Sequence, residues 1–363
     1  MKKRRLREGF TTGACAAAAA KAAALALKGE TPREVEIPFP DGRRRRLPVA
    51  WARKTGPHTA EAAVIKDAGD DPDVTHGAEI RVCLRPGRTK GLLFKAGPGV
   101  GRVTKPGLPV PPGEPAINPG PRRMIQEALA EVFPPEGLEV EISVPGGETL
   151  AQKTLNPRLG IIGGLSILGT TGLVKPLSAE AWLATIESCL SVARAVGLSQ
   201  VVLSFGRTSE MAHQKTYGFP EEAYILMGDY LEFTLKKTRE AGFQKAVLCG
   251  QWAKLLKCAL CVEKPPRVPE PYGFTTHVRH GVIRGREALE FLRKLGLAPP
   301  FPEKPFNTAR EVFLFLETLP RKTQEGIFRA VLSRAKALAQ TLAPGLNLSV
   351  VLVNYRREVV FEF

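Results

Sequence analysis

The sequence predicts two kinds of fold in succession: an α+β part over the first 145 residues and an α/β part with a parallel sheet after Pro176. Three observations predict this. Hairpin signals join the early strands. A repeat of strand, loop and helix follows Pro176, which is typical of a parallel sheet. A length of 363 residues with 44% hydrophobic content is enough for two domains with cores of their own.

The α+β part begins with a helix predicted over residues 10–28. Thr11 and Thr12 can cap its first turn, the alanines at 16–20 are strong helix formers, and Gly29 ends it. A β-hairpin follows around the turn at 40–42. The further elements predicted here are hairpin strands at 35–39 and 44–51, strands at 80–84, 92–95 and 138–144, and a helix that opens at Pro119 or Pro121.

The α/β part begins with a helix that Ser178 caps. Ligands bind beyond the carboxyl ends of the strands in such sheets, so the predicted binding edge lies at 206–208 and 250–251. The predicted elements are helices at 178–195, 221–241, 251–261, 308–317 and 323–342, and strands at 200–205, 245–249, 346–354 and 359–363, with a proline-rich connector at 264–271. The predicted domains are 1–177, 178–265 and 266–363, the last being an α/β extension that packs on the others.

The charge balance is strongly basic, with 52 lysines and arginines against 36 acidic residues and a formal net charge of +16. This surplus indicates a polyanionic small molecule, a nucleic acid or an anionic membrane, or a basic surface that serves no ligand. Aromatic residues make up only 7%, and no aromatic strand motif occurs, which argues against nucleic acid. We expect no membrane span, and the scattered cysteines and lack of a signal peptide predict a cytoplasmic protein.

The first candidate binding segment is the helix start at 9–15. Small residues at a helix start leave backbone N–H groups open, and the positive end of the helix dipole attracts a carboxylate or phosphate. Thr11, Thr12 and Gly13 are the candidate ligand contacts. The alternative is that Thr12 is simply an N-cap, and spacing alone favours the N-cap.

The second candidate is the aspartate-rich segment, residues 66–77, which holds four aspartates and a histidine. Asp70, Asp73 and His76 could supply a general base, or the carboxylates could hold a cation. The alternative is a solvated loop whose aspartates cap turns, and the two interpretations are equally supported.

The third candidate is the segment at 118–123, where Asn118 precedes a helix whose first turn carries Arg122 and Arg123. Arginines at a helix start oppose the helix dipole, which indicates a nearby anion, and a guanidinium can bind a carboxylate through two hydrogen bonds. The alternative is a solvated basic surface.

The fourth candidate is the glycine-rich loop, residues 156–172, in which five glycines interrupt an apolar run. Glycine lets a backbone turn tightly and approach a ligand closely, so the ligand-binding interpretation is favoured over a buried strand with bends. By contrast, we interpret Cys258 and Cys261 as core thiols, and His277 with His280 does not suffice for a metal site, so no metal site is predicted. The candidate ligand contacts of the loop are Asn156, Arg158, Gly163, Gly164, Gly169, Thr170, Thr171 and Gly172.

Taken together and in this order, these four segments resemble the CbiD family, the cobalt-precorrin-5B C(1)-methyltransferases of anaerobic cobalamin synthesis. The family-like stretches are 9–24, 66–77, 99–125 and 144–176, and the resemblance continues more thinly to about residue 261. It implies an α+β domain joined to a Rossmann-like α/β domain. It also implies S-adenosylmethionine as methyl donor and cobalt only as part of the corrinoid substrate. The acetate and propionate arms of that substrate give the basic surplus a polyanionic partner.

The resemblance also implies roles for the candidate residues. Methyl transfer of this kind needs alignment and exclusion of water more than side-chain chemistry. Asp70, Asp73 and His76 would be candidate bases, while Gly206 and Gly250 would line the α/β part of the site. Three arginines would hold the carboxylate arms: Arg122, Arg123 and Arg158. The stretch 163–172 would lie against the cofactor or the ring.

The α/β part departs from the family pattern. The family's Gly-His-x-Gly-Lys is replaced by 250–254, in which Gln251 stands for the histidine. Its Gly-Asn-Tyr-Gly is replaced by Gly206-Arg207, and Val282 stands where an aspartate is expected between Thr276-His277 and Arg284. An alternative function is therefore a non-catalytic corrinoid-binding paralogue. The sequence is compatible with a monomer or a homo-oligomer.

Overall fold

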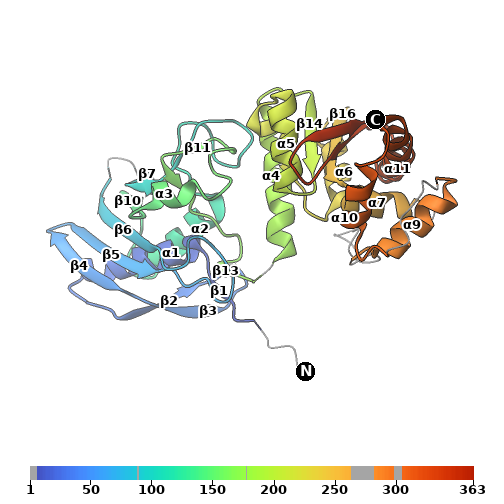
Figure 1. Ribbon diagram of the computed structural model, residues 1–363. Helices are drawn as coiled ribbons and strands as arrows, with labels where there is room; N and C mark the ends of the chain where they lie inside the picture. Colours follow the sequence, from blue (N-terminus) through green and yellow to red (C-terminus); the bar gives the residue numbers. More distant parts are fainter. Residues whose placement is uncertain (1–5, 88–89, 177, 263–281, 298–304) are drawn as a thin grey trace. The chain divides into compact units, whose positions relative to one another are not determined.

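The computed structural model describes residues 6–87, 90–176, 178–262, 282–297 and 305–363 of a mixed α/β protein (Figure 1). The chain forms two compact units, an N-terminal unit of residues 1–180 and a C-terminal unit of residues 181–363. Each contains a five-stranded sheet with both parallel and antiparallel pairs. No helix within the described ranges is long and apolar enough to cross a membrane.

The sheet of the N-terminal unit has the order β4-β5-β6-β10-β7. Its pairs are antiparallel except for the last, in which β10 and β7 run parallel. The sequence analysis missed β5, because its alanines at 60, 62 and 63 favour a helix by local propensity. The bounds are β4 Trp51–Gly56, β5 Thr59–Ile65, β6 Glu79–Pro86, β7 Leu93–Ala96 and β10 Leu138–Ser143.

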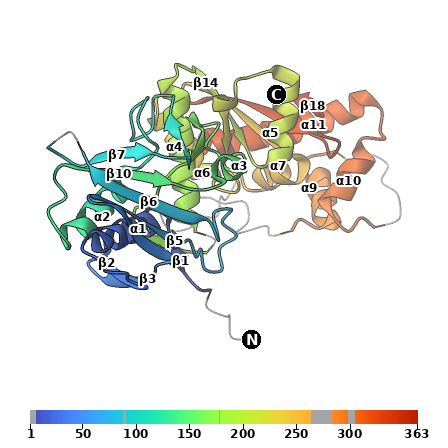
Figure 2. The ribbon, with the colours of Figure 1, turned by 90° about the vertical axis from the view of Figure 1, so that its left-hand side faces the viewer.

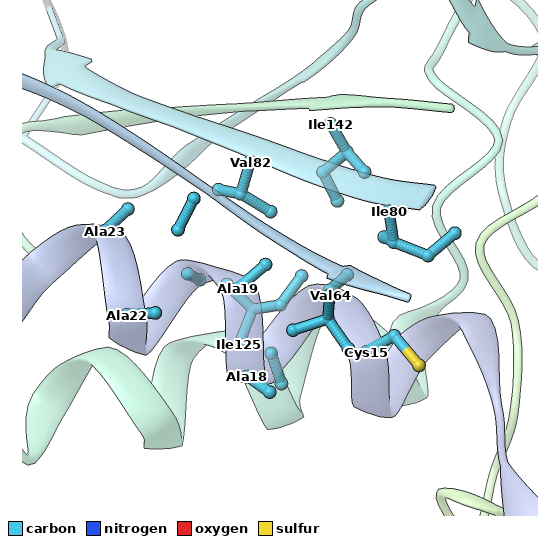
Figure 3. Close-up of a cluster of buried hydrophobic side chains, with 14 of the residues drawn as sticks. Cys15, Ala18, Ala19, Ala22, Ala23, Val64, Ile80, Val82, Ile125 and Ile142 are labelled. Atoms are coloured by element: carbon cyan, nitrogen blue, oxygen red, sulfur yellow. The ribbon is translucent and has the colours of Figure 1, made fainter. Parts of the chain in front are cut away.

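Helix α1 (Thr12–Leu27) forms the centre of this unit, and its alanines are buried on every side. The sheet covers one side of α1, and helix α2 (Pro119–Ala130) covers another. Figure 3 shows Ala19 and Ala22 of α1 among Val64 and Val82 of the sheet and Ile125 of α2. A helix that is apolar all round must be enclosed, and alanine keeps the neighbouring backbones close. The predicted cap is confirmed, since the Thr11 side chain accepts from the Ala14 N–H at 3.2 Å.

The unit also contains short two-stranded ribbons, and all but the β2–β3 hairpin connect segments far apart in the sequence. The predicted hairpin is confirmed as β2 and β3, although the predicted strand at 44–51 breaks after Pro48. The bounds are β1 Gly9–Phe10, β2 Glu34–Pro38, β3 Arg44–Pro48, β8 Gly99–Val100, β9 Arg102–Val103, β11 Ile161–Ile162, β12 Gly164–Leu165 and β13 Leu173–Val174, with helix α3 at Gly147–Ala151. The pairs are β1 with β13, β2 with β3, β8 with β12, and β9 with β11.

The sheet of the C-terminal unit has the order β15-β14-β16-β17-β18, with only β18 antiparallel. Figure 2 shows β14 and β18 of this sheet together with the helices of the unit. In chain order the strands read 2-1-3-4-5, a doubly wound arrangement. The connection from β14 to β15 and the one from β15 to β16 run in opposite directions, so right-handed crossovers place α5 and α6 on opposite faces. The strands are β14 Gln200–Ser204, β15 Tyr224–Leu226, β16 Lys245–Gln251, β17 Asn347–Val353 and β18 Val359–Glu362. The helices are α4 Ala179–Ala195, α5 Arg207–Tyr217, α6 Leu231–Glu240, α7 Trp252–Leu260, α9 Gly285–Lys294, α10 Ala309–Leu316 and α11 Arg321–Leu342.

One predicted element of this unit is wrong. The helix predicted over 221–241 is a short 3-10 turn (Glu221–Ala223), strand β15 and then α6. Tyr224 and Ile225 are fully buried and pair with β14. Gly228 has a φ of +60°, a conformation that a continuous helix over 221–241 could not contain. Local helix formers such as Glu and Ala misled the prediction, because strand pairing depends on residues distant in sequence. Helices α5 and α9 were not predicted.

The predicted domain segment 266–363 supplies β17 and β18 to the same sheet as β14 and β16. The predicted boundary at 177 lies close to the division between the two units at residue 180, and no further division separates 178–265 from the rest. The predicted connector at 264–271 lies outside the described residues.

Candidate functional site

The glycine-rich loop runs across the start of α1. The Thr12 hydroxyl accepts from the Leu168 N–H at 2.9 Å, and the Gly13 N–H donates to the Leu168 carbonyl at 3.0 Å. The Thr11 N–H donates to the Gly172 carbonyl at 3.0 Å. Gly169 has a φ of +124°, and a Cβ there would lie 2.4 Å from the Thr11 hydroxyl, so only glycine fits this crossing.

These contacts account for the helix start without a ligand. The N–H of Gly13 is bonded to the loop, and the N–H groups of Ala14 and Cys15 are bonded to the Thr11 hydroxyl and carbonyl. Thr12 is only 4% exposed. Thr11 is therefore the N-cap of α1, whereas Thr12, for which the N-cap role was predicted, bonds the loop instead. Ligand contact by Thr11, Thr12 or Gly13 stays a prediction.

The start of α2 meets the same loop from the other side. The Asn118 N–H donates to the Ile167 carbonyl at 2.9 Å, and a Cβ on Gly120 would lie 3.1 Å from the Gly169 carbonyl. The two neighbouring arginines differ. Arg122 donates to the Ile117 carbonyl at 2.8 Å and to Glu114 at 2.7 Å, whereas Arg123 is exposed and has no ion pair within the described part of the chain. Arg123 is therefore the more available cation.

The base of the loop is held by a buried amide. The Asn156 side chain donates to the Gly164 carbonyl at 3.3 Å and accepts from the Ser166 hydroxyl at 3.4 Å. Arg158, two residues on, is half-buried. The outer surface of the loop is exposed at Gly163, Thr170 and Thr171. Ile162 and Leu168 are 54% and 47% exposed, which places two apolar side chains on that surface.

The aspartate-rich segment is folded by its own charged groups. The Lys66 ammonium is 1% exposed and lies 2.7 Å from Asp73, which also accepts from the Thr75 N–H at 2.8 Å. Burial raises the pKa of Asp73, but the hydrogen bonds from Lys66 and Thr75 outweigh it and hold that pKa below its usual value. The carboxylate of Asp70 accepts from the Arg7 N–H at 2.8 Å.

His76 is poorly arranged for a base in this structure. Its Nδ1 accepts from the Ala68 N–H at 3.1 Å, so the proton of the neutral ring is on Nε2. The predicted base role of Asp70, Asp73 and His76 stays a prediction, while each side chain has a structural contact.

The four candidate segments come together in the N-terminal unit. The Phe10 N–H donates to the Asp67 carbonyl at 2.7 Å, next to the pairing of β1 with β13. Gly9 lies against the backbone of the aspartate-rich segment, since a Cβ there would be 2.1 Å from the Ala68 carbonyl carbon. The starts of α1 and α2, the aspartate-rich segment and the glycine-rich loop therefore form one contiguous region.

Gly206 and Gly250 lie in the C-terminal unit, at the carboxyl ends of two adjacent strands. Gly206 follows β14, and Gly250 lies within the end of β16. The order of the strands makes this the switch point, where doubly wound sheets bind ligands. Helix α5 follows Gly206 with no side-chain cap, and the space around a Cβ on Gly206 is open. Gly250 differs, because a Cβ there would lie 2.8 Å from the Phe205 ring.

Sequence reasoning missed two charged residues at this edge. Asp229 follows β15, and Lys254 lies in the first turn of α7 with its ammonium 3.5 Å from the Asp229 carboxylate. The signal that could have found Asp229 is the buried run Tyr224–Leu226 before a Gly-Asp turn, which the predicted helix concealed.

No cluster of side chains suited to a metal ion occurs in the parts of the chain that the structure describes. Cys258 and Cys261 are buried as predicted, and burial raises the pKa of Cys258 well above its usual range. His277 and His280 lie outside the described residues, as do Thr276 and its neighbours. Val282 is 75% exposed.

Comparisons with known proteins agree on one family. The CbiD family profile matches residues 1–176. The cobalt-precorrin-5B C(1)-methyltransferase of Desulfotalea psychrophila is 46% identical over 99% of this chain and 98% of its own length. The protein of the same name from Geobacter metallireducens is 44% identical over 98% of both chains. A crystal structure of a cobalamin biosynthesis protein (cbiD) from Archaeoglobus fulgidus is 30% identical, with a TM-score of 0.39 over 68% of this chain and 77% of that one.

Proposed function

The chain belongs to the CbiD family, and we propose that it transfers a methyl group from S-adenosylmethionine to ring carbon 1 of cobalt-precorrin-5B, giving cobalt-precorrin-6A. The observation that carries this proposal is identity of 46% and 44% to methyltransferases of that name over nearly the whole of each chain. Such identity spans both units, so the proposal does not depend on one motif. The enzyme is an S-adenosylmethionine-dependent methyltransferase of cobalamin biosynthesis.

S-adenosylmethionine supplies an activated methyl group on a sulfonium, so the chain's own residues have to orient the reactants and exclude water. The switch point of the C-terminal unit fits this group. Space is open around Gly206, the starts of α5 and α7 have no side-chain caps, and the edge carries charged side chains. Gly206 would let the backbone at this edge lie close to the bound group, whereas Gly250 leaves room for the Phe205 ring.

We assign the corrinoid to the outer surface of the glycine-rich loop in the N-terminal unit. The exposed Ile162 and Leu168 offer apolar contact to a macrocycle, and the exposed Thr170 offers a hydroxyl, while the Thr171 hydroxyl bonds the Leu173 backbone. Arg123 would hold a carboxylate arm, since it is exposed beside this loop. Arg158 would hold another, whereas Arg122 is engaged by the segment before α2, through Glu114 and the Ile117 carbonyl.

The aspartate-rich segment would act by positioning. Lys66 and Asp73 fix the fold of the segment, and the segment in turn holds strand β1 at the start of α1. The contact of His76 with the Ala68 N–H favours the same conclusion. A proton released from the macrocycle would then go to solvent or to a substrate group.

The test is a methyl-transfer assay with purified protein, labelled S-adenosylmethionine and cobalt-precorrin-5B, with mass analysis of the corrinoid. We expect one added methyl at ring carbon 1 with repeated turnover. Tight corrinoid binding without turnover would instead support the non-catalytic paralogue, which Gln251 and Val282 suggest from the sequence. A folded protein that neither binds nor methylates the corrinoid would refute both.

A further inference from the structure

The ion pair between Asp229 and Lys254 crosses the switch point of the C-terminal unit. Asp229 follows β15, and Lys254 follows β16, while β14 lies between these two strands. The two loops therefore flank the carboxyl end of β14, after which Gly206 begins α5. This is the place in a doubly wound sheet where a nucleotide-like ligand binds.

The pair is partly accessible. The side chains of Asp229 and Lys254 are 22% and 36% exposed, and their 3.5 Å separation is long for a charged hydrogen bond. Partly exposed pairs of this kind contribute little to stability, so a ligand can replace part of the contact at small cost. Gly228, with a φ of +60°, sets the turn that carries Asp229 to this edge.

A second feature of the same edge indicates a polar ligand. Ser204, the last residue of β14, is fully buried, and its hydroxyl has no hydrogen-bond partner among the described residues. Ser204 pairs with Cys249, whose thiol donates to the Ser209 carbonyl in the first turn of α5. The Ser204 hydroxyl therefore lies on the α5 side of the sheet, beneath the uncapped start of that helix.

We infer that Asp229 binds the ribose hydroxyls of the adenosyl group and that Lys254 orients its carboxylate. The inference rests on the proposed function and names a contact within the same site. A carboxylate only accepts hydrogen bonds, and it can accept from both hydroxyls of a diol. In doubly wound dinucleotide folds an acidic residue roughly 20 residues beyond the glycine turn has this role. Asp229 stands at that interval from Gly206.

The test is a cycle that combines a protein change with a ligand change. Isothermal titration calorimetry would measure S-adenosylhomocysteine and its 2′-deoxy analogue against the wild-type chain and Asp229→Asn. S-adenosylhomocysteine lacks the sulfonium charge, which limits general electrostatic effects. Loss of a hydrogen bond to a charged group should weaken binding of S-adenosylhomocysteine about 10- to 100-fold in the variant. Removing the hydroxyl should cost the wild type a similar factor and cost the variant almost nothing.

Two further variants separate recognition from folding. Glu187→Gln removes another carboxylate that pairs with a lysine, at 3.0 Å from Lys237, and should leave both affinities unchanged. Lys254→Met breaks the ion pair but keeps Asp229, so discrimination between the two ligands should persist. If Asp229→Asn weakens both ligands equally, or neither, Asp229 does not bind the ribose and the inference is wrong. If the wild type does not bind S-adenosylhomocysteine at all, the inference falls together with the proposed function.

Discussion

Breaking the Lys66–Asp73 ion pair should lower the free energy of unfolding more when Asp73 is replaced than when Lys66 is replaced. Lys66 is 1% exposed and Asp73 is 26% exposed, so Asp73→Asn leaves a buried ammonium without its anion. Removing one partner of a buried pair costs about 3–5 kcal/mol, and partial access of water at Asp73 places the expected loss near the lower value, about 3 kcal/mol. Lys66→Met puts an uncharged chain of similar length in the buried position and leaves Asp73 bonded to Thr75. Its expected cost is about 1 kcal/mol.

The assay is urea unfolding of the protein, in which the fluorine NMR signals of incorporated 5-fluorotryptophan monitor the N-terminal unit. Trp51 is the single tryptophan in the sequence of that unit and reports on it separately from Trp182 and Trp252. The double variant Lys66→Met with Asp73→Asn should be close to Lys66→Met alone, because it leaves no buried charge. If Lys66→Met is the more costly single change, the assignment of the buried charge is wrong.

The same variants test the pH dependence and the chemistry. The pKa of Asp73 lies below its usual value of about 4, so its contribution to stability is complete above that pH and is lost as the pH falls through the folded-state pKa. The difference between wild type and Asp73→Asn should therefore shrink below about pH 4. Loss of a general base costs about 10²–10⁴ in rate. A folded double variant that retains methyl transfer within about tenfold would exclude Asp73 as the base.

Three other predictions follow from the packing, the loop surface and a buried histidine. Ala19→Leu should destabilise the N-terminal unit by about 1–3 kcal/mol in urea unfolding, because Ala19 is enclosed. The control Ala130→Leu, at an exposed helix position, should change stability by less than about 0.5 kcal/mol, and equal effects of the two variants would contradict the packing. Arg123→Gln and Leu168→Ser should each weaken corrinoid binding about tenfold in a fluorescence titration and leave the melting temperature unchanged. A fall in melting temperature without a change in binding would contradict the proposed surface. Burial lowers the pKa of His213 to about 4, so the C-terminal unit should lose stability as the pH falls from 6.5 toward 4. His213→Gln should flatten that pH dependence, and an unchanged slope would show that another group titrates.

The sequence was informative where the signal is local. The alanine run and the threonine cap predicted α1, and the apolar runs at 200–205 and 245–249 predicted the two strands that carry Gly206 and Gly250. It failed where pairing between distant segments decides the structure. Strand β5 has helix-forming alanines, yet it lies in the sheet because small side chains let α1 approach. Strand β15 is hidden in a helix-like run for the same reason, and Asp229 with it.

The candidate site was predicted as segments more successfully than as residues. The four segments do come together around the start of α1. What local reasoning could not supply is the partner of each group: that the Thr12 hydroxyl bonds Leu168, that Arg122 bonds Glu114, and that His76 accepts from Ala68. Each of these partners is brought close by the tertiary fold, and each decides whether a side chain is available to a ligand.

The enclosure of α1 explains why the alanine run of this helix is so uniform. Ala16 through Ala20 are fully buried in the core that α1 forms with the sheet and α2. Figure 3 shows Ala18 and Ala19 of this run among side chains of both. Their identity sets the spacing between two layers of backbone, and a saturation library over these positions should accept only glycine, serine and alanine. The alanine run is thus a spacer of fixed thickness between helix and sheet. It would be retained in a descendant that had lost its catalytic residues.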